Sequence, residues 1–107
     1  MTRNELIERT SRLIAEGERL QQQPSLPALR TWLQISDELL SAAWGSMDRY
    51  HLVWLTVGRS NEVRGRRMSQ EEESAYVRDV AAQKTAALQM SLKAAHDHMP
   101  FLGETPG

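Results

Sequence analysis

Apolar residues recur at helical spacing along most of this chain. From Leu6 to Leu20 they follow the i, i+3, i+4 pattern of one helix face. Thr2 and Glu5 stand just before this stretch in the order of a capping box, in which each side chain bonds a free backbone N–H at the start of a helix. The pattern predicts an amphipathic helix that begins at Thr2.

A second apolar stripe follows after a short connection. Pro24 disfavours helix at the residue before it, whereas Ser25 can cap a new helix whose first turn accepts Pro27. Because short connections join antiparallel neighbours, we expect the second helix to fold back on the first as a hairpin. Its predicted core face consists of Leu29, Trp32, Leu33, Ser36, Leu39, Leu40, Ala43 and Trp44.

Residues 47–57 are apolar on several sides and fit two structures. Val, Trp, Tyr and Thr in a short run suit a buried strand, but a lone strand leaves its backbone groups without partners, so we favour a helix. We expect Trp54 to be buried only by self-association. A partner interface is therefore predicted at Tyr50, Val53, Trp54 and Val57.

The last helix is expected to be long. Ser69 and Glu72 form a second capping-box signature, and Pro100 stops the helix. Its main stripe includes Leu88, and Met90 is expected to widen that stripe. Together these patterns predict an all-α bundle of about four helices in one domain over residues 1–99, with an antiparallel hairpin, a long C-terminal helix and a loosely ordered tail at 100–107.

Composition narrows the classes of partner. The 107 residues carry 13 Lys and Arg against 14 Asp and Glu, a formal net charge of -1, so the whole molecule has no field that would draw it onto nucleic acid or a membrane. The absence of cysteine excludes disulfides and thiolate metal sites. We expect a cytoplasmic protein that does not enter a membrane.

Four arginines stand close together in residues 59–67, between the apolar segment and the last helix. Their guanidinium groups match phosphate geometry, which would allow nucleic-acid or anion contact. The alternative, which we favour, is a solvated turn whose arginines pair with neighbouring glutamates such as Glu62 and Glu71. The residues concerned are Arg59, Arg64, Arg66 and Arg67.

Two further positions carry chemistry-bearing side chains. Lys84 falls within the last apolar stripe, where we expect its stem to cover apolar surface and its charge to reach solvent or a carboxylate such as Asp37 or Asp48. His96 and His98 point to different sides of a helix, so with Asp97 they are expected to form a solvated helix end and not a metal site. We predict no catalytic set, no metal and no cofactor.

Several segments resemble a known class of domain. They are Leu13-Ile14-Ala15-Glu16-Gly17-Glu18-Arg19-Leu20, Trp32, Leu39-Leu40, Trp44-Gly45 with Tyr50, and Ala81-x-x-Lys84-x-x-x-Leu88. Over residues 5–95 the chain is similar to helical accessory domains that precede TIR or nucleotide-sensing effector domains in bacterial abortive-infection proteins. The resemblance implies an accessory or assembly module and transfers no catalytic residue.

We therefore expect a non-enzymatic protein–protein interaction or self-assembly module. It would form a homo-oligomer or bind a separately encoded protein, as an accessory component of a bacterial defence system. The alternative is a small nucleic-acid-binding regulator that uses the arginines of residues 59–67.

Overall fold

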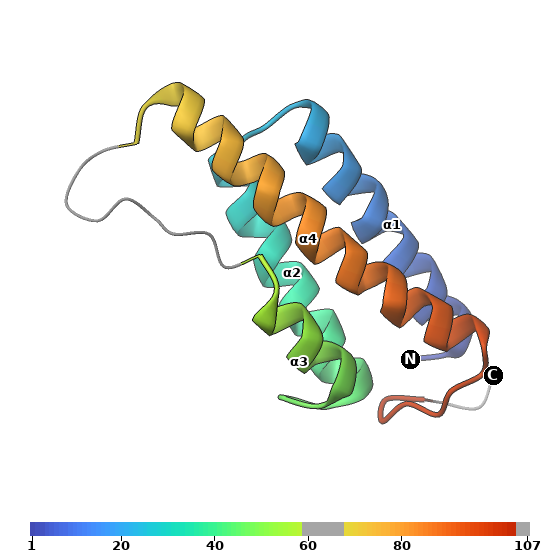
Figure 1. The fold of residues 1–107 in the computed structure, drawn as a ribbon. Coiled ribbons are helices and arrows are strands. Elements are labelled where there is room, and N and C mark those ends of the chain that lie inside the picture. The colour runs from blue at the N-terminus through green and yellow to red at the C-terminus, as the bar shows by residue number, and fades with distance from the viewer. Residues whose placement is uncertain (59–67, 105–107) are drawn as a thin grey trace.

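The computed structural model describes residues 1–58 and 68–104, which form four α-helices (Figure 1). They are α1 (Arg3–Gln22), α2 (Leu26–Trp44), α3 (Arg49–Thr56) and α4 (Gln70–His96). The described residues contain no strand, so the all-α prediction is confirmed, including the choice of helix for the apolar segment that became α3.

α1, α2 and α4 begin where the sequence predicted, whereas α3 begins two residues after the predicted position 47, with Asp48 as its N-cap. Thr2 accepts from the backbone N–H of Glu5 at the start of α1, and Ser69 accepts in the same way from Glu72 at the start of α4. Both glutamates bond back to the capping residue, so both capping boxes are formed. Gly45 caps the end of α2 with a φ of 106°, a backbone conformation that glycine adopts readily and that is strained for other residues.

The chain folds as a hairpin against which the last helix packs lengthwise. α1 runs antiparallel to both α2 and α4, and its most extensive contacts are with α4 (Figure 1). α3 is short and rests on α2 and α4. The core thus lies between α1, α2 and α4, with α3 attached to one side.

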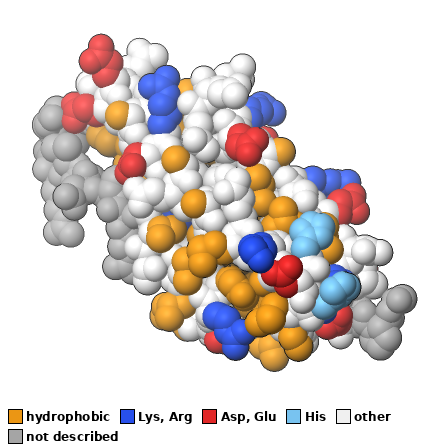
Figure 2. Space-filling view, turned by 45° about the vertical axis from the view of Figure 1, so that its right-hand side comes forward, with side chains coloured by type: hydrophobic (Ala, Val, Ile, Leu, Met, Phe, Trp, Pro, Cys, Tyr) orange, Lys and Arg blue, Asp and Glu red, His pale blue; other side chains and the backbone are white. Residues whose placement is uncertain are grey.

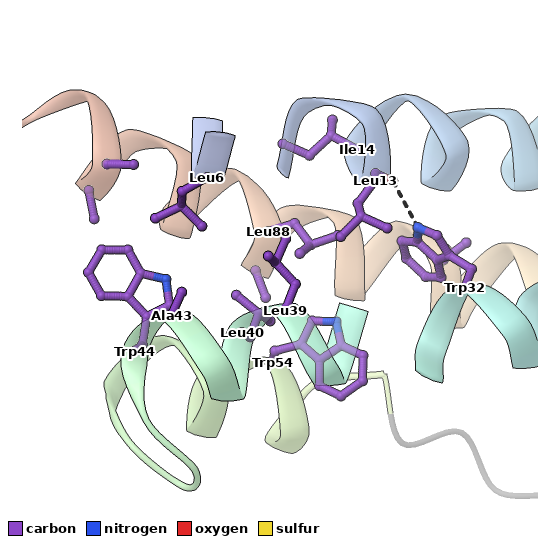
Figure 3. Packing of buried hydrophobic residues seen from close by; sticks show 14 of the residues in the cluster. Leu6, Leu13, Ile14, Trp32, Leu39, Leu40, Ala43, Trp44, Trp54 and Leu88 are labelled. Atoms are coloured by element: carbon purple, nitrogen blue, oxygen red, sulfur yellow. Dashed lines mark hydrogen bonds between the residues drawn. The ribbon is translucent and has the colours of Figure 1, made fainter. Parts of the chain in front are cut away.

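Buried leucines and two tryptophans fill this core. Leu6, Leu40 and Leu88 are fully buried between the three long helices (Figure 3). The indole N–H of Trp32 donates to the backbone carbonyl of Leu13 at 2.8 Å, and that of Trp44 donates to the hydroxyl of Ser91 at 2.8 Å. Both tryptophans are core residues, as predicted, and their polar atoms are satisfied.

A glycine allows α1 to approach its neighbours closely. A Cβ added at Gly17 would lie 2.1 Å from the hydroxyl oxygen of Thr85 on α4 and 2.7 Å from Cζ2 of Trp32 on α2. No side chain fits there without displacing these groups. Gly17 is a packing notch in the middle of α1.

Residues 100–104 pack back onto the bundle, which differs from the loose tail that we expected. Phe101 is buried, with its ring centroid 5.8 Å from that of Trp44. Arg3 lies 5.3 Å from the Phe101 ring and donates to the carbonyls of Ala95 and Met99. The reason for the difference is that Phe101 covers core surface at the end of α2. Residues 105–107 lie outside the described part.

None of the described helices combines the length and the apolar character needed to cross a membrane.

Candidate interaction surface

Polar contacts tie the start of α3 to α2. His51 is only 4% exposed; its Nδ1 accepts from the backbone N–H of Met47 at 2.9 Å, and its Nε2 bonds to the carboxylate of Asp37 on α2. Because Nδ1 serves as an acceptor, the hydrogen-bond pattern assigns the proton of a neutral ring to Nε2, which donates to Asp37. This arrangement holds the start of α3 against α2.

The end of α3 is tied to α4 by Lys84. Its ammonium donates to the backbone carbonyl of Trp54 and lies 4.1 Å from the centroid of the Trp54 ring. The carbonyl belongs to the last turn of α3, where helix carbonyls lack intrahelical partners and attract cations. The buried stem was predicted, but the sequence did not suggest Trp54 as the partner.

Trp54 itself does not act as an exposed anchor. It is 4% exposed within the single chain, and its ring stacks on His51 with centroids 6.3 Å apart. The prediction that only self-association would bury Trp54 is therefore wrong. The physical reason is that α3 lies across α2 and α4, so this side of the helix faces the core.

The other predicted interface residues are half-buried, with Tyr50 and Val53 on α3 and Val57 at its C-terminal end. Tyr50, Val53 and Val57 all pack against the core without being enclosed by it. The Tyr50 ring lies 4.7 Å from that of Trp44, centroid to centroid. Contact with Trp44 fixes Tyr50 at the edge of the bundle, where it remains accessible.

Beside Tyr50 lies a shallow hollow of about 270 Å³. Met90 is 50% exposed here. Figure 2 shows hydrophobic side chains gathered around charged ones on this part of the molecule, near α3 and the C-terminal end of α4. We call this site the α3–α4 surface and define it by the residues lining the hollow: Tyr50, Met90, Lys93, Ala94, Asp97 and Met99.

An ion pair at the C-terminal end of α4 borders the α3–α4 surface. Lys93 donates to the carboxylate of Asp97 at 2.7 Å. This hydrogen bond raises the pKa of Lys93 and lowers the pKa of Asp97, and the attraction between the two charges adds to both shifts. Both groups are therefore charged near neutral pH, which gives the apolar hollow a polar border.

Met90, like Trp54, differs in exposure from what the sequence predicted. It was assigned to the apolar stripe of the last helix, yet it follows Leu88 by two positions, and two residues correspond to about 200° around an α-helix. Leu88 is fully buried, so Met90 must point to the opposite side. That angular mismatch was the signal in the sequence that marked the exposed residue.

The remaining candidates lie elsewhere. Arg59, Arg64, Arg66 and Arg67 are outside the described residues, so anion or nucleic-acid contact stays a prediction. His96 and His98 are exposed at the end of α4. Within residues 1–58 and 68–104, no group of three or more His, Asp or Glu side chains is arranged to hold a metal ion.

Comparison with known proteins adds no relative: no protein-family model, curated protein or solved structure matches this chain.

Proposed function

We propose that this protein is a non-enzymatic interaction module that binds a separately encoded protein through the α3–α4 surface. The observation that carries the proposal is the exposure of Met90 beside the hollow next to Tyr50. Covering a large apolar side chain of this kind removes it from water, which is the main favourable term in protein association.

The composition of the surface supports a protein partner. Aromatic residues and methionine are enriched where proteins meet, and methionine adapts its shape to the surface it contacts. Tyr50 is already held against Trp44, so little side-chain entropy remains to be lost when it is covered. Lys93 and Asp97 supply a charged border that would orient the partner.

The resemblance of residues 5–95 to accessory domains of bacterial abortive-infection proteins supports the choice of partner. A separately encoded effector protein is the partner class that it suggests. A cytoplasmic role as an accessory component of a defence system belongs to the same proposal.

Site-specific crosslinking in the source cells tests this proposal. A photoreactive amino acid at position 90 should capture a discrete protein other than this chain, whereas the same group at Glu18, an exposed position on α1, should not. Purified wild-type protein should compete for the captured partner, and Met90→Asp should compete at least about tenfold less well.

For the competition to be meaningful, the Met90→Asp variant must remain folded. Because position 90 is half exposed, we expect the free energy of unfolding of the variant to differ from that of the wild type by no more than about 0.5 kcal/mol. Equal capture from positions 90 and 18, or capture only of a second copy of this chain from position 90, would contradict the proposal.

A further inference from the structure

A larger hollow, of about 430 Å³, lies between α1 and α2. Leu13 and Leu39 are nearly buried within it, and Arg9 and Arg12 stand on its α1 side opposite Glu38 on its α2 side. We call this site the α1–α2 groove, and its lining residues are Met1, Arg9, Arg12, Leu13, Ile35, Glu38, Leu39 and Ala42.

Ile35 gives the groove an apolar projection of its own. It is 49% exposed, and Glu38, Leu39 and Ala42 follow it at i+3, i+4 and i+7, which places all four on one face of α2. Leu39 lies at the edge of the core stripe that contains Leu40 and Trp44, whereas Ile35, Glu38 and Ala42 are exposed outside it. A site that carries both a hollow and a projection can match a copy of itself.

We propose that the α1–α2 groove is the interface of a symmetric dimer, with a second copy of this chain as its occupant. If the helices of the two copies run parallel or antiparallel to each other, two grooves can meet face to face about a two-fold axis in two ways. An axis across the helices sets α1 against α1, and if it passes at the level of Arg12, Arg12 meets Arg12. An axis along the helices sets α1 against α2 of the partner copy, so that arginine meets glutamate.

The positions of these residues along the hairpin favour the second arrangement. Leu13 and Ile35 lie equally far from Pro24 in sequence, so in an antiparallel hairpin they stand at the same level. An axis along the helices preserves level, which sets Ile35 of each copy over Leu13 of the other. Glu38 is farther from Pro24 than Arg12 and nearer than Arg9, so it falls between the two arginines of the other copy.

The pairing requires little rearrangement. In the single chain Arg9 pairs with Glu5 and Arg12 with Glu8, both within one helix and both exposed to solvent. Exposed pairs of this kind contribute little, so exchanging or sharing them costs little. A face two helices wide and about 30 Å long covers roughly 600 Å² per copy, close to the roughly 800 Å² per partner of a standard interface.

Sedimentation equilibrium of the purified full chain tests the proposal. The wild-type protein should approach twice the monomer mass of 12.2 kDa as its concentration rises from about 5 to about 500 µM. Ile35→Asp should remain monomeric over the same range. Met90→Asp, which alters the α3–α4 surface, should dimerise like the wild type, so this test is separate from that of the proposed function.

Charge reversal tests the orientation of the two copies. Arg12→Glu and Glu38→Arg should each raise the dissociation constant about tenfold, and the double variant should recover most of the loss, because each reversed charge again faces its opposite. Circular dichroism should show unchanged helix content for all these variants, since the altered side chains are exposed.

Three results would overturn the proposal. The first is a wild-type protein that stays monomeric up to the highest concentration. The second is a dimer that Ile35→Asp leaves intact. The third is a double variant that recovers none of the lost affinity, which would show that Arg12 of one copy does not face Glu38 of the other.

Discussion

The contact between α1 and α4 differs in kind from the attachment of α3. α1 and α4 meet along their length through small and apolar residues, with Gly17 against Thr85 and Leu88 fully buried. α3 has only eight residues and is positioned by directional polar contacts, from His51 to Asp37 and from Lys84 to the Trp54 carbonyl, in addition to the burial of Trp54.

This difference indicates which part of the molecule can move more easily. Apolar burial spread over many residues survives small displacements, whereas a hydrogen bond weakens steeply once its geometry is lost. α3 should therefore open more readily than the three-helix body. It also carries Tyr50, so the α3–α4 surface is built partly on the most easily displaced helix.

The largest expected effect comes from filling the notch in α1. Gly17→Ala removes a helix-interior glycine, which by propensity alone would stabilise the protein by about 1 kcal/mol. The added methyl collides with Thr85 and Trp32, and such overpacking costs typically about 1–3 kcal/mol, so we expect a net loss of up to about 2 kcal/mol. Urea denaturation measures this loss.

The sign of the change in the free energy of unfolding on Gly17→Ala tests whether α1 lies as close to its neighbours as described. Ser11→Ala, at an exposed position of the same helix, should stay within about 0.5 kcal/mol of the wild type. A Gly17→Ala variant more stable than the wild type would show that α1 and α4 do not approach as closely as described.

A smaller and local effect is expected from removing one of the hydrogen bonds that hold α3 against α2. Asp37→Ala removes the acceptor for His51 Nε2–H, which should cost about 1 kcal/mol. Hydrogen exchange should become faster at the amides of Arg49–Thr56 while those in the middle of α1 and α4 keep their protection.

Asp37→Asn is the matched control, because its amide oxygen can still accept from the imidazole. It should restore most of the protection of α3. Uniformly faster exchange across all four helices in Asp37→Ala would mean that α3 is not a separately opening unit.

The smallest effect concerns the first capping box. Hydrogen bonds from the backbone and side chain of Thr2 lower the pKa of Glu5 from its ordinary value of 4.5. Glu5 therefore contributes stability above its unfolded-state pKa, and this contribution is lost as pH falls through the lower folded-state pKa. Glu5→Gln should be less stable than the wild type near pH 7, and the difference should shrink toward about pH 3.

Chemical denaturation of both proteins at several pH values measures the effect of Glu5. Because the groups outside position 5 are common to the two chains, their titration cancels in the comparison. A difference that stays constant down to about pH 3 would show that the charge of Glu5 has no part in the cap.

Helix ends and the core face could be predicted from the sequence, because their causes are local. Thr2, Ser25 and Ser69 cap helices through hydrogen bonds to residues three positions away, and periodic leucines identify the buried side. The burial of Trp32 and Trp44 followed from the same periodicity. The three long helices therefore required no long-range information, whereas the helix at residues 47–57 was inferred because a lone strand would have had no partner.

The candidate surfaces depended on contacts that no local pattern encodes. Trp54 was expected to be exposed because nothing in the sequence showed that α3 would lie across α2 and α4. The bonds from His51 to Asp37 and from Lys84 to Trp54 join residues far apart in the chain. The exposure of Ile35 likewise could not be predicted, because it depends on how α1 packs against α2.

The pairing of α1 with α4 has a consequence for how quickly this chain can fold. The most extensive helix contact joins the first helix to the last, so most of the chain must be closed into a loop before that contact forms. Loop closure of this kind costs entropy and slows folding relative to bundles whose principal contacts are between successive helices. We expect the α1–α2 hairpin to form first and α4 to pack against it in a later step.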